Sequence, residues 1–198
     1  MILNNYIKRG DNMKIALDFG HGGKDPGAVD EKGDDTIYPD KFYTEESKLV
    51  RHIGLKLSAK LDENHEIYLV RPNEDYVNLE DRTELANADE VDIFISLHAN
   101  ASANRKANGI ETLHYPGSEE GIRLASKVQR RVIERSKATN RGIKPREDLF
   151  VLKGTNMPSI LFEIGFITNN QEEQKLHNKA YQKQIIEGIY EGVQKYGR

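Results

Sequence analysis

Short apolar runs alternate with amphipathic segments along most of the chain. The runs have the β-branched and aromatic content of buried strands. They predict strands at 14–19, 66–70, 92–97, 109–115, 149–152 and 159–162. Segments with a helical apolar period predict helices at 45–64, 79–88 and 119–136, and one or two closing helices at 171–196. Strands that alternate with helices indicate an α/β fold with a largely parallel sheet.

The first predicted helix places one acid among its apolar positions. Leu49, Val50 and Ile53 form a single helical face, and Glu46 precedes them at spacings of three, four and seven. Glu45 lies about 100° around the helix and should face away. The pattern therefore selects Glu46 as the acid that points inward, with Thr44 as the predicted N-cap.

Three reactive side chains follow apolar strands. His21 follows the first strand in DFGHGG, His98 lies in FISLHAN and Glu163 lies in ILFEIGF. Ligands of parallel α/β sheets bind beyond the carboxyl ends of the strands. If these strands are neighbours, the three side chains converge, and Glu46 can join them from its helix.

Two imidazoles and a carboxylate are a common catalytic zinc set that leaves a fourth position open. The chain has no cysteine, so a metal would have to be held by His, Asp or Glu. We therefore predict one Zn²⁺ on His21, Glu46 and His98. A second acid near the metal, Glu163, can take a proton from water and pass one to a leaving amine.

The remaining candidates carry weaker signals. The other histidines do not end a predicted strand and are expected to be surface or hydrogen-bonded residues; they are His52, His65, His114 and His177. Glu111 is a rival acid, but its position within a strand suggests a structural hydrogen bond. The glycine-rich GHGGKDPG lacks the GxxxxGK[ST] pattern of a phosphate loop.

Composition limits the classes of partner. A length of 198 residues favours one domain. The net charge of −3 offers no basic footprint for nucleic acid. No apolar run reaches the roughly 18–20 residues that cross a bilayer, so no membrane insertion is expected. The first residues lack the apolar core of a signal peptide, which predicts synthesis in the cytoplasm.

Several blocks, in order, resemble the zinc-dependent N-acetylmuramoyl-L-alanine amidases: DFGHGGKDPGA, EESKLVRHIGLKL, FISLHAN, GIETLHY and LFVLKGTNMPSILFEIGFITN. The resemblance implies a twisted, mainly parallel sheet of about six strands flanked by helices in a single domain. It implies hydrolysis of the amide between N-acetylmuramic acid and L-alanine in peptidoglycan. It places the zinc ligands on His21, Glu46 and His98, the catalytic acid on Glu163 and a substrate contact on Asn100.

The resemblance begins at about Lys14, which divides the chain into an extension at 1–13 and a catalytic domain at 14–198. The sequence does not give the oligomeric state, for which a monomer is favoured. The loop at 27–44 is longer than usual and is expected either to form a wall of the cleft or to be a solvated surface loop. Between Tyr115 and Leu149 the pattern predicts one helix and a turn, without an inserted helix over the zinc. An open, constitutively active site is therefore expected. The missing secretion signal fits a phage-type lysin and equally fits a fragment without its leader.

The sequence alone is compatible with two other functions. A zinc peptidase that cuts within the stem peptide would use the same residues, because the metal sets the reaction type and the loops select the substrate. A non-catalytic wall-binding module is disfavoured because all four reactive residues are present.

Overall fold

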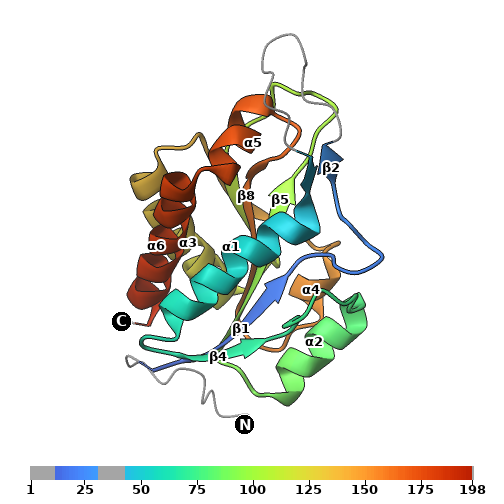
Figure 1. Ribbon diagram of the computed structural model, residues 1–198. Coiled ribbons are helices and arrows are strands. Elements are labelled where there is room, and N and C mark those ends of the chain that lie inside the picture. Colours follow the sequence, from blue (N-terminus) through green and yellow to red (C-terminus); the bar gives the residue numbers. More distant parts are fainter. Residues whose placement is uncertain (1–11, 31–42, 198) are drawn as a thin grey trace.

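The computed structural model describes residues 12–30 and 43–197. The predicted extension at 1–13 and the long loop at 27–44 therefore lie mostly outside the described residues. Within the described part, six strands form one sheet in the order β4-β1-β5-β8-β6-β7 (Figure 1). The strands are β1 (Lys14–Phe19), β4 (Glu66–Leu69), β5 (Ile93–Asn100), β6 (Ile110–His114), β7 (Asn140–Pro145) and β8 (Ser159–Phe166).

Neighbouring strands of this sheet run parallel except for β6 and β8, which pair antiparallel. The expected mainly parallel α/β sheet is confirmed, and β1, β5 and β8 are neighbours as the site requires. A second, small antiparallel pair joins β2 (Val29–Asp30) to β3 (Thr44–Glu45).

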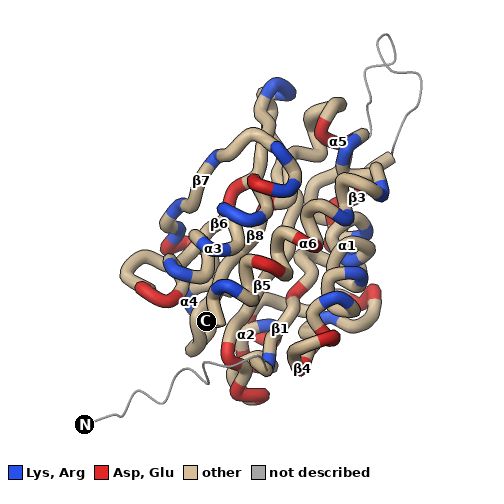
Figure 2. Tube along the Cα trace, turned by 90° about the vertical axis from the view of Figure 1, so that its left-hand side faces the viewer, with Lys and Arg blue, Asp and Glu red and all other residues tan. Residues whose placement is uncertain are grey.

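Helices cover both faces of the sheet (Figure 2). The described helices are α1 (Glu46–Leu61), α2 (Leu79–Ala88), α3 (Glu119–Ser136), α4 (Phe150–Lys153), α5 (Asn170–His177) and α6 (Lys179–Tyr196). Helices α1, α3 and α6 pack against the larger apolar cluster, whereas α2 and α4 cover the opposite face.

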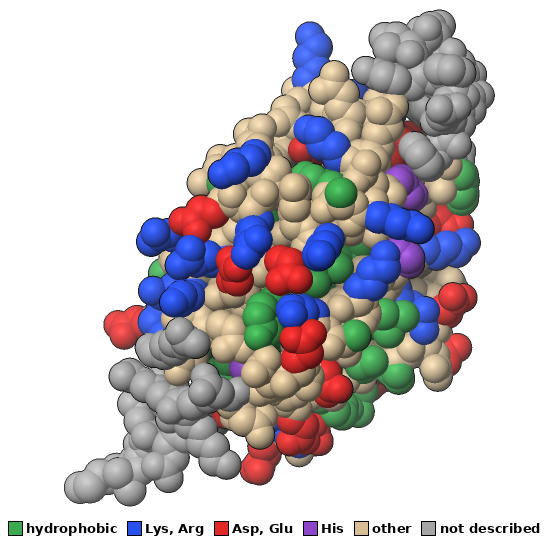
Figure 3. Space-filling model, turned by 60° about the vertical axis from the view of Figure 1, so that its left-hand side comes forward, with side chains coloured by type: hydrophobic (Ala, Val, Ile, Leu, Met, Phe, Trp, Pro, Cys, Tyr) green, Lys and Arg blue, Asp and Glu red, His purple; other side chains and the backbone are tan. Residues whose placement is uncertain are grey.

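The surface carries charges of both signs. On the face shown in Figure 3, Lys and Arg side chains lie beside Asp and Glu, and hydrophobic side chains form only small patches. Among the described helices, none has the length and apolar character needed to span a bilayer.

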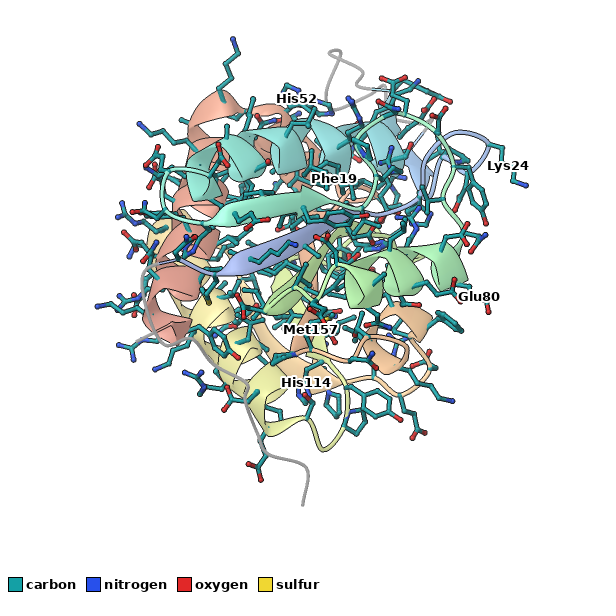
Figure 4. The ribbon with its side chains drawn as sticks, turned by 90° about the horizontal axis from the view of Figure 1, so that it is seen from below. Phe19, Lys24, His52, Glu80, His114 and Met157 are labelled. Atoms are coloured by element: carbon teal, nitrogen blue, oxygen red, sulfur yellow. The ribbon has the colours of Figure 1, made fainter. Side chains whose placement is uncertain are left out.

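Strand alternation divides the core into two clusters. Phe19 belongs to the larger cluster and lies beneath α1, whereas Met157 belongs to the smaller cluster on the other side of β1 (Figure 4). Both faces of the central strands are therefore buried, which explains why 14–19 and 92–97 read as nearly continuous apolar runs.

Three local predictions were wrong. Residues 149–152 lie largely in helix α4 rather than in a strand, because a four-residue apolar run fits either structure. Strand β7 was missed, because its NRGIKP sequence has the glycine, proline and cations of an edge strand. Thr44 is not the N-cap of α1; Glu45 occupies that position, and the Thr44 hydroxyl donates to Glu173 instead.

A buried ion pair lies between β1 and α2. Arg82 Nη1 is 2.5 Å from Asp18 Oδ1, and the two side chains are 3% and 1% exposed. The Ser96 hydroxyl donates to the second oxygen of Asp18 over 2.7 Å. Arg82 also donates to the carbonyls of Phe19 and His21, so the pair fixes the turn that follows β1.

We expect Arg82→Met to lower the free energy of unfolding by about 3–5 kcal/mol, because Asp18 would remain buried without its cation. Chemical denaturation measures this loss. The control is Arg130→Met, which removes a cation that is 72% exposed and paired with Glu134. The control should change stability by less than about 1 kcal/mol. An equally small effect of Arg82→Met would contradict the structural role of the pair.

Candidate functional site

His21, Glu46 and His98 meet at the carboxyl edge of the sheet. His21 Nε2 lies 3.2 Å from Glu46 Oε2, and His98 Nδ1 lies 2.9 Å from Glu46 Oε1. One candidate ligand atom from each residue falls within 4.8 Å of the other two. The imidazole rings stand at 77° with their centroids 5.0 Å apart. The three residues thus come together from the turn after β1, from α1 and from β5, and their role as zinc ligands stays a prediction.

The turn after β1 orients His21. Its backbone φ of 62° lies in the left-handed region, which few residues other than glycine adopt. Its Nδ1 lies 2.9 Å from Asp25 Oδ2, so the second ring nitrogen, Nε2, faces Glu46. A carboxylate on the outer nitrogen is a common way to fix a metal-binding histidine. Sequence reasoning missed Asp25, although it stands four residues after His21 in the same glycine-rich turn.

Backbone groups hold the Glu46 carboxylate in place. The Ala28 N–H donates to Oε2 and the Ala99 N–H donates to Oε1, each over 3.0 Å. Glu46 is 4% exposed. Burial acts to raise its pKa, but the hydrogen bonds and positive charge of His21 and His98 outweigh it and lower the pKa well below the usual range. The carboxylate is therefore ionised at neutral pH.

Burial would lower the pKa of His21, but its contacts with Glu46 and then Asp25 overcome this effect and raise the pKa to about 9. Without a bound cation, His21 therefore carries a proton at neutral pH.

Two glycines leave room for the cluster. A Cβ on Gly20 would lie 2.3 Å from the His98 ring. A Cβ on Gly27 would lie 2.6 Å from the His21 ring and 2.7 Å from Glu46 Oε2. No side chain fits at these distances, so glycine at both positions is a steric requirement of the cluster.

Arg71 ties the two halves of the cluster together. It is 2% exposed and donates to the carbonyls of Phe19 at 2.9 Å, Gly20 at 3.3 Å and Ser47 at 3.3 Å. These carbonyls belong to the turn before His21 and to the residue after Glu46. Sequence reasoning missed this residue as well. The only signal was a cation directly after an apolar strand, in YLVRP.

Glu163 lies beside the cluster on β8. It pairs in register with His98 of β5. Its Oε2 is buried and has no hydrogen-bond partner among the described residues. Burial raises the pKa of Glu163 to about 7; His98 opposes the rise, and Glu46 and Glu111 add to it. A carboxyl group with this pKa can both accept and donate a proton near neutral pH.

Asn100 and Glu111 bind each other. The Asn100 amide donates to Glu111 Oε1 over 3.0 Å. Glu111 Oε2 accepts from Arg141 Nε at 2.8 Å and from Lys144 Nζ at 2.5 Å. The expected structural hydrogen bonding of Glu111 is confirmed, whereas the substrate contact of Asn100 stays a prediction.

The other four histidines do not join the candidate metal group found among the described residues. His65 Nδ1 accepts from the Met13 N–H, His177 contacts Thr44, and His52 lies beside Lys56. The statement that His114 does not end a strand was wrong, because it is the last residue of β6. Since β6 runs antiparallel to β8, this end lies at the edge of the sheet away from the cluster.

A pocket of about 330 Å³ adjoins His21 and His98. Its wall carries three exposed apolar side chains, Tyr76, Leu79 and Phe150. Residues between Tyr115 and Leu149 form α3 and β7, so the expected turn is a strand. Constitutive activity of an open site stays a prediction.

Comparisons with known proteins agree with this architecture. The sequence model of the N-acetylmuramoyl-L-alanine amidase family matches residues 15–195. YqiI of Bacillus subtilis strain 168 is 32% identical over 94% of this chain and 85% of its own length. The amidase LytC of the same strain is 30% identical over 93% of this chain. The chain spans only 35% of the length of LytC.

Solved structures give the same result. An N-acetylmuramoyl-L-alanine amidase from Clostridium difficile 630 superposes with a TM-score of 0.85 and 36% identity, covering 94% of this chain and 97% of that one. The catalytic domain of the amidase CwlV from Bacillus (Paenibacillus) polymyxa var. colistinus superposes with a TM-score of 0.82 and 28% identity, covering 93% of this chain and 97% of that one. With the family match over nearly the whole described fold, the chain belongs to the N-acetylmuramoyl-L-alanine amidase family.

Proposed function

We propose that this chain is a zinc-dependent hydrolase that cleaves the amide between N-acetylmuramic acid and L-alanine in peptidoglycan. The observation that carries the proposal is the meeting of His21, Glu46 and His98 within 4.8 Å, beside the buried carboxyl group of Glu163. Family membership supports the choice of bond, and peptidoglycan is the proposed partner.

The residues at the cluster fit one Zn²⁺. Two imidazole nitrogens and a carboxylate oxygen are zinc donors, and Asp25 holds the outer nitrogen of one imidazole. Gly20 and Gly27 keep side chains out of the space beside these donors. Zinc bound there would polarise an amide carbonyl and lower the pKa of water to about 7.

Glu163 is the proposed general base and acid. Its carboxylate takes a proton from the attacking water as a C–O bond forms at the lactyl carbonyl carbon. It then delivers that proton to the nitrogen of L-alanine as the C–N bond breaks, because an amine leaves poorly unless it is protonated. A pKa near 7 suits both transfers.

We expect Glu163→Gln to lower turnover of purified peptidoglycan at least about 100-fold, because the proton carrier is lost. Zinc content, measured in parallel, should remain at one per chain. The matched control is Glu134→Gln, which changes an exposed acid on α3 and should retain full activity. A Glu163→Gln protein with wild-type turnover would remove the proposed base.

Analysis of the reaction products shows which amide bond is cut. New L-alanine amino termini with intact muramic acid are the expected products. Amino termini from within the stem peptide would instead identify a peptidase that uses the same residues.

We expect Asp25→Ala to weaken zinc binding by about 10–100-fold, because the outer nitrogen of His21 loses its carboxylate partner. Titration against a competing chelator measures the change. The control is Lys24→Ala, which alters the exposed neighbouring residue without touching His21. Unchanged zinc affinity in Asp25→Ala would exclude this carboxylate from the support of the site.

A further inference from the structure

Three site residues form one row across the sheet. His98 of β5 pairs with Glu163 of β8, and Glu163 pairs with Glu111 of β6. Paired residues on neighbouring strands project to the same face, and the strands lie about 4.8 Å apart. Glu111 therefore lies one strand beyond the proposed base and about 10 Å from His98 along the sheet.

At its Glu111 end, the row meets two positive side chains and one negative one. Arg141 and Lys144, both on β7, contact the same oxygen of Glu111. Burial would raise the pKa of Glu111, but the two cations lower it, so one carboxylate faces two positive charges. The side chains of Arg141 and Lys144 are 32% and 42% exposed, whereas that of Glu111 is 9% exposed. Figure 2 shows Lys and Arg positions around β7.

Glu111 fixes the two cations without covering them. The Asn100 amide occupies its other oxygen, so both oxygens of the carboxylate have partners. Arg141 also lies over the ring of Phe166, with 4.8 Å between its Cζ and the ring centroid. These contacts hold the cations in defined positions that remain open to solvent.

The pocket that adjoins His21 and His98 differs from β7 in having a largely apolar wall. The two acids in its wall at the surface are already paired, Asp25 with His21 and Asp148 with Arg146. An anionic group of a substrate is attracted toward β7, where two cations share one carboxylate. The site therefore has one mainly apolar side at this pocket and one cationic side at β7.

We propose that Arg141 and Lys144 bind a free carboxylate on the second residue of the stem peptide. This inference rests on the proposed function. An extended peptide advances by about 3.3–3.6 Å per residue, so the second residue lies roughly 7 Å beyond the scissile carbonyl. Its carboxylate then reaches the cations at Glu111. The stem peptide runs over β8 and β6 toward β7, and the sugar lies on the side of Tyr76 and Phe150.

The test compares two synthetic N-acetylmuramoyl tripeptides in which the third residue is joined to the side-chain carboxyl of the second. The two substrates differ only at the α-carbon of the second residue, which carries a carboxylic acid in one and a carboxamide in the other. The zinc-loaded wild-type protein should show kcat/KM at least about tenfold higher for the acid, because charge-assisted hydrogen bonds are the stronger ones. Lys144→Gln and Arg141→Gln should each remove most of this preference through a higher KM for the acid. Turnover of the amide should fall by a clearly smaller factor than turnover of the acid.

Two further variants separate binding from structure. Lys144→Arg keeps the charge and should keep the preference. Arg130→Gln removes an exposed cation from α3 and should change neither substrate. The proposed subsite would be overturned if the wild-type protein turned over both substrates equally. It would also be overturned if the variants lost activity on both substrates to the same extent. Absence of turnover on either substrate and on purified peptidoglycan would instead contradict the proposed function, and the subsite with it.

Discussion

The site depends on one buried carboxylate that two imidazoles share. Glu46 contacts Nε2 of His21 through one oxygen and Nδ1 of His98 through the other, and the backbone of Ala28 and Ala99 completes its hydrogen bonds. A buried charge is costly unless it is paired. This requirement brings the first turn of α1 to the ends of β1 and β5. The donor atoms are therefore close together before any cation binds.

Two buried arginines make this arrangement rigid. Arg71 and Arg82 donate to backbone carbonyls of residues 19–21, and Arg71 also reaches the carbonyl of Ser47 beside Glu46. Arg82 is paired with Asp18, so the turn is anchored to β1 and α2 together. Functional groups held by such supporting contacts lose little conformational freedom when a ligand binds. The fold thus supplies the geometry that the proposed reaction needs.

Local periodicity was enough to predict β1, α2 and α3 and to select Glu46 from its neighbour. It could not identify β7 or distinguish α4 from a strand, because short segments take their structure from the sheet they join. The row from His98 through Glu163 to Glu111 depends on which residues of neighbouring strands pair with each other. The carbonyl contacts of Arg71 likewise join residues distant in the chain. Neither follows from any sequence window.

The most direct measurement is anomalous diffraction at the zinc absorption edge from crystals of the zinc-loaded protein. We predict one ion, with Nε2 of His21, Nδ1 of His98 and a Glu46 oxygen at about 2.0–2.2 Å. The two contacts between Glu46 and the imidazoles should then be replaced by bonds to the ion. Zinc bound elsewhere, with both contacts of Glu46 intact, would contradict the assignment of these three residues as its ligands.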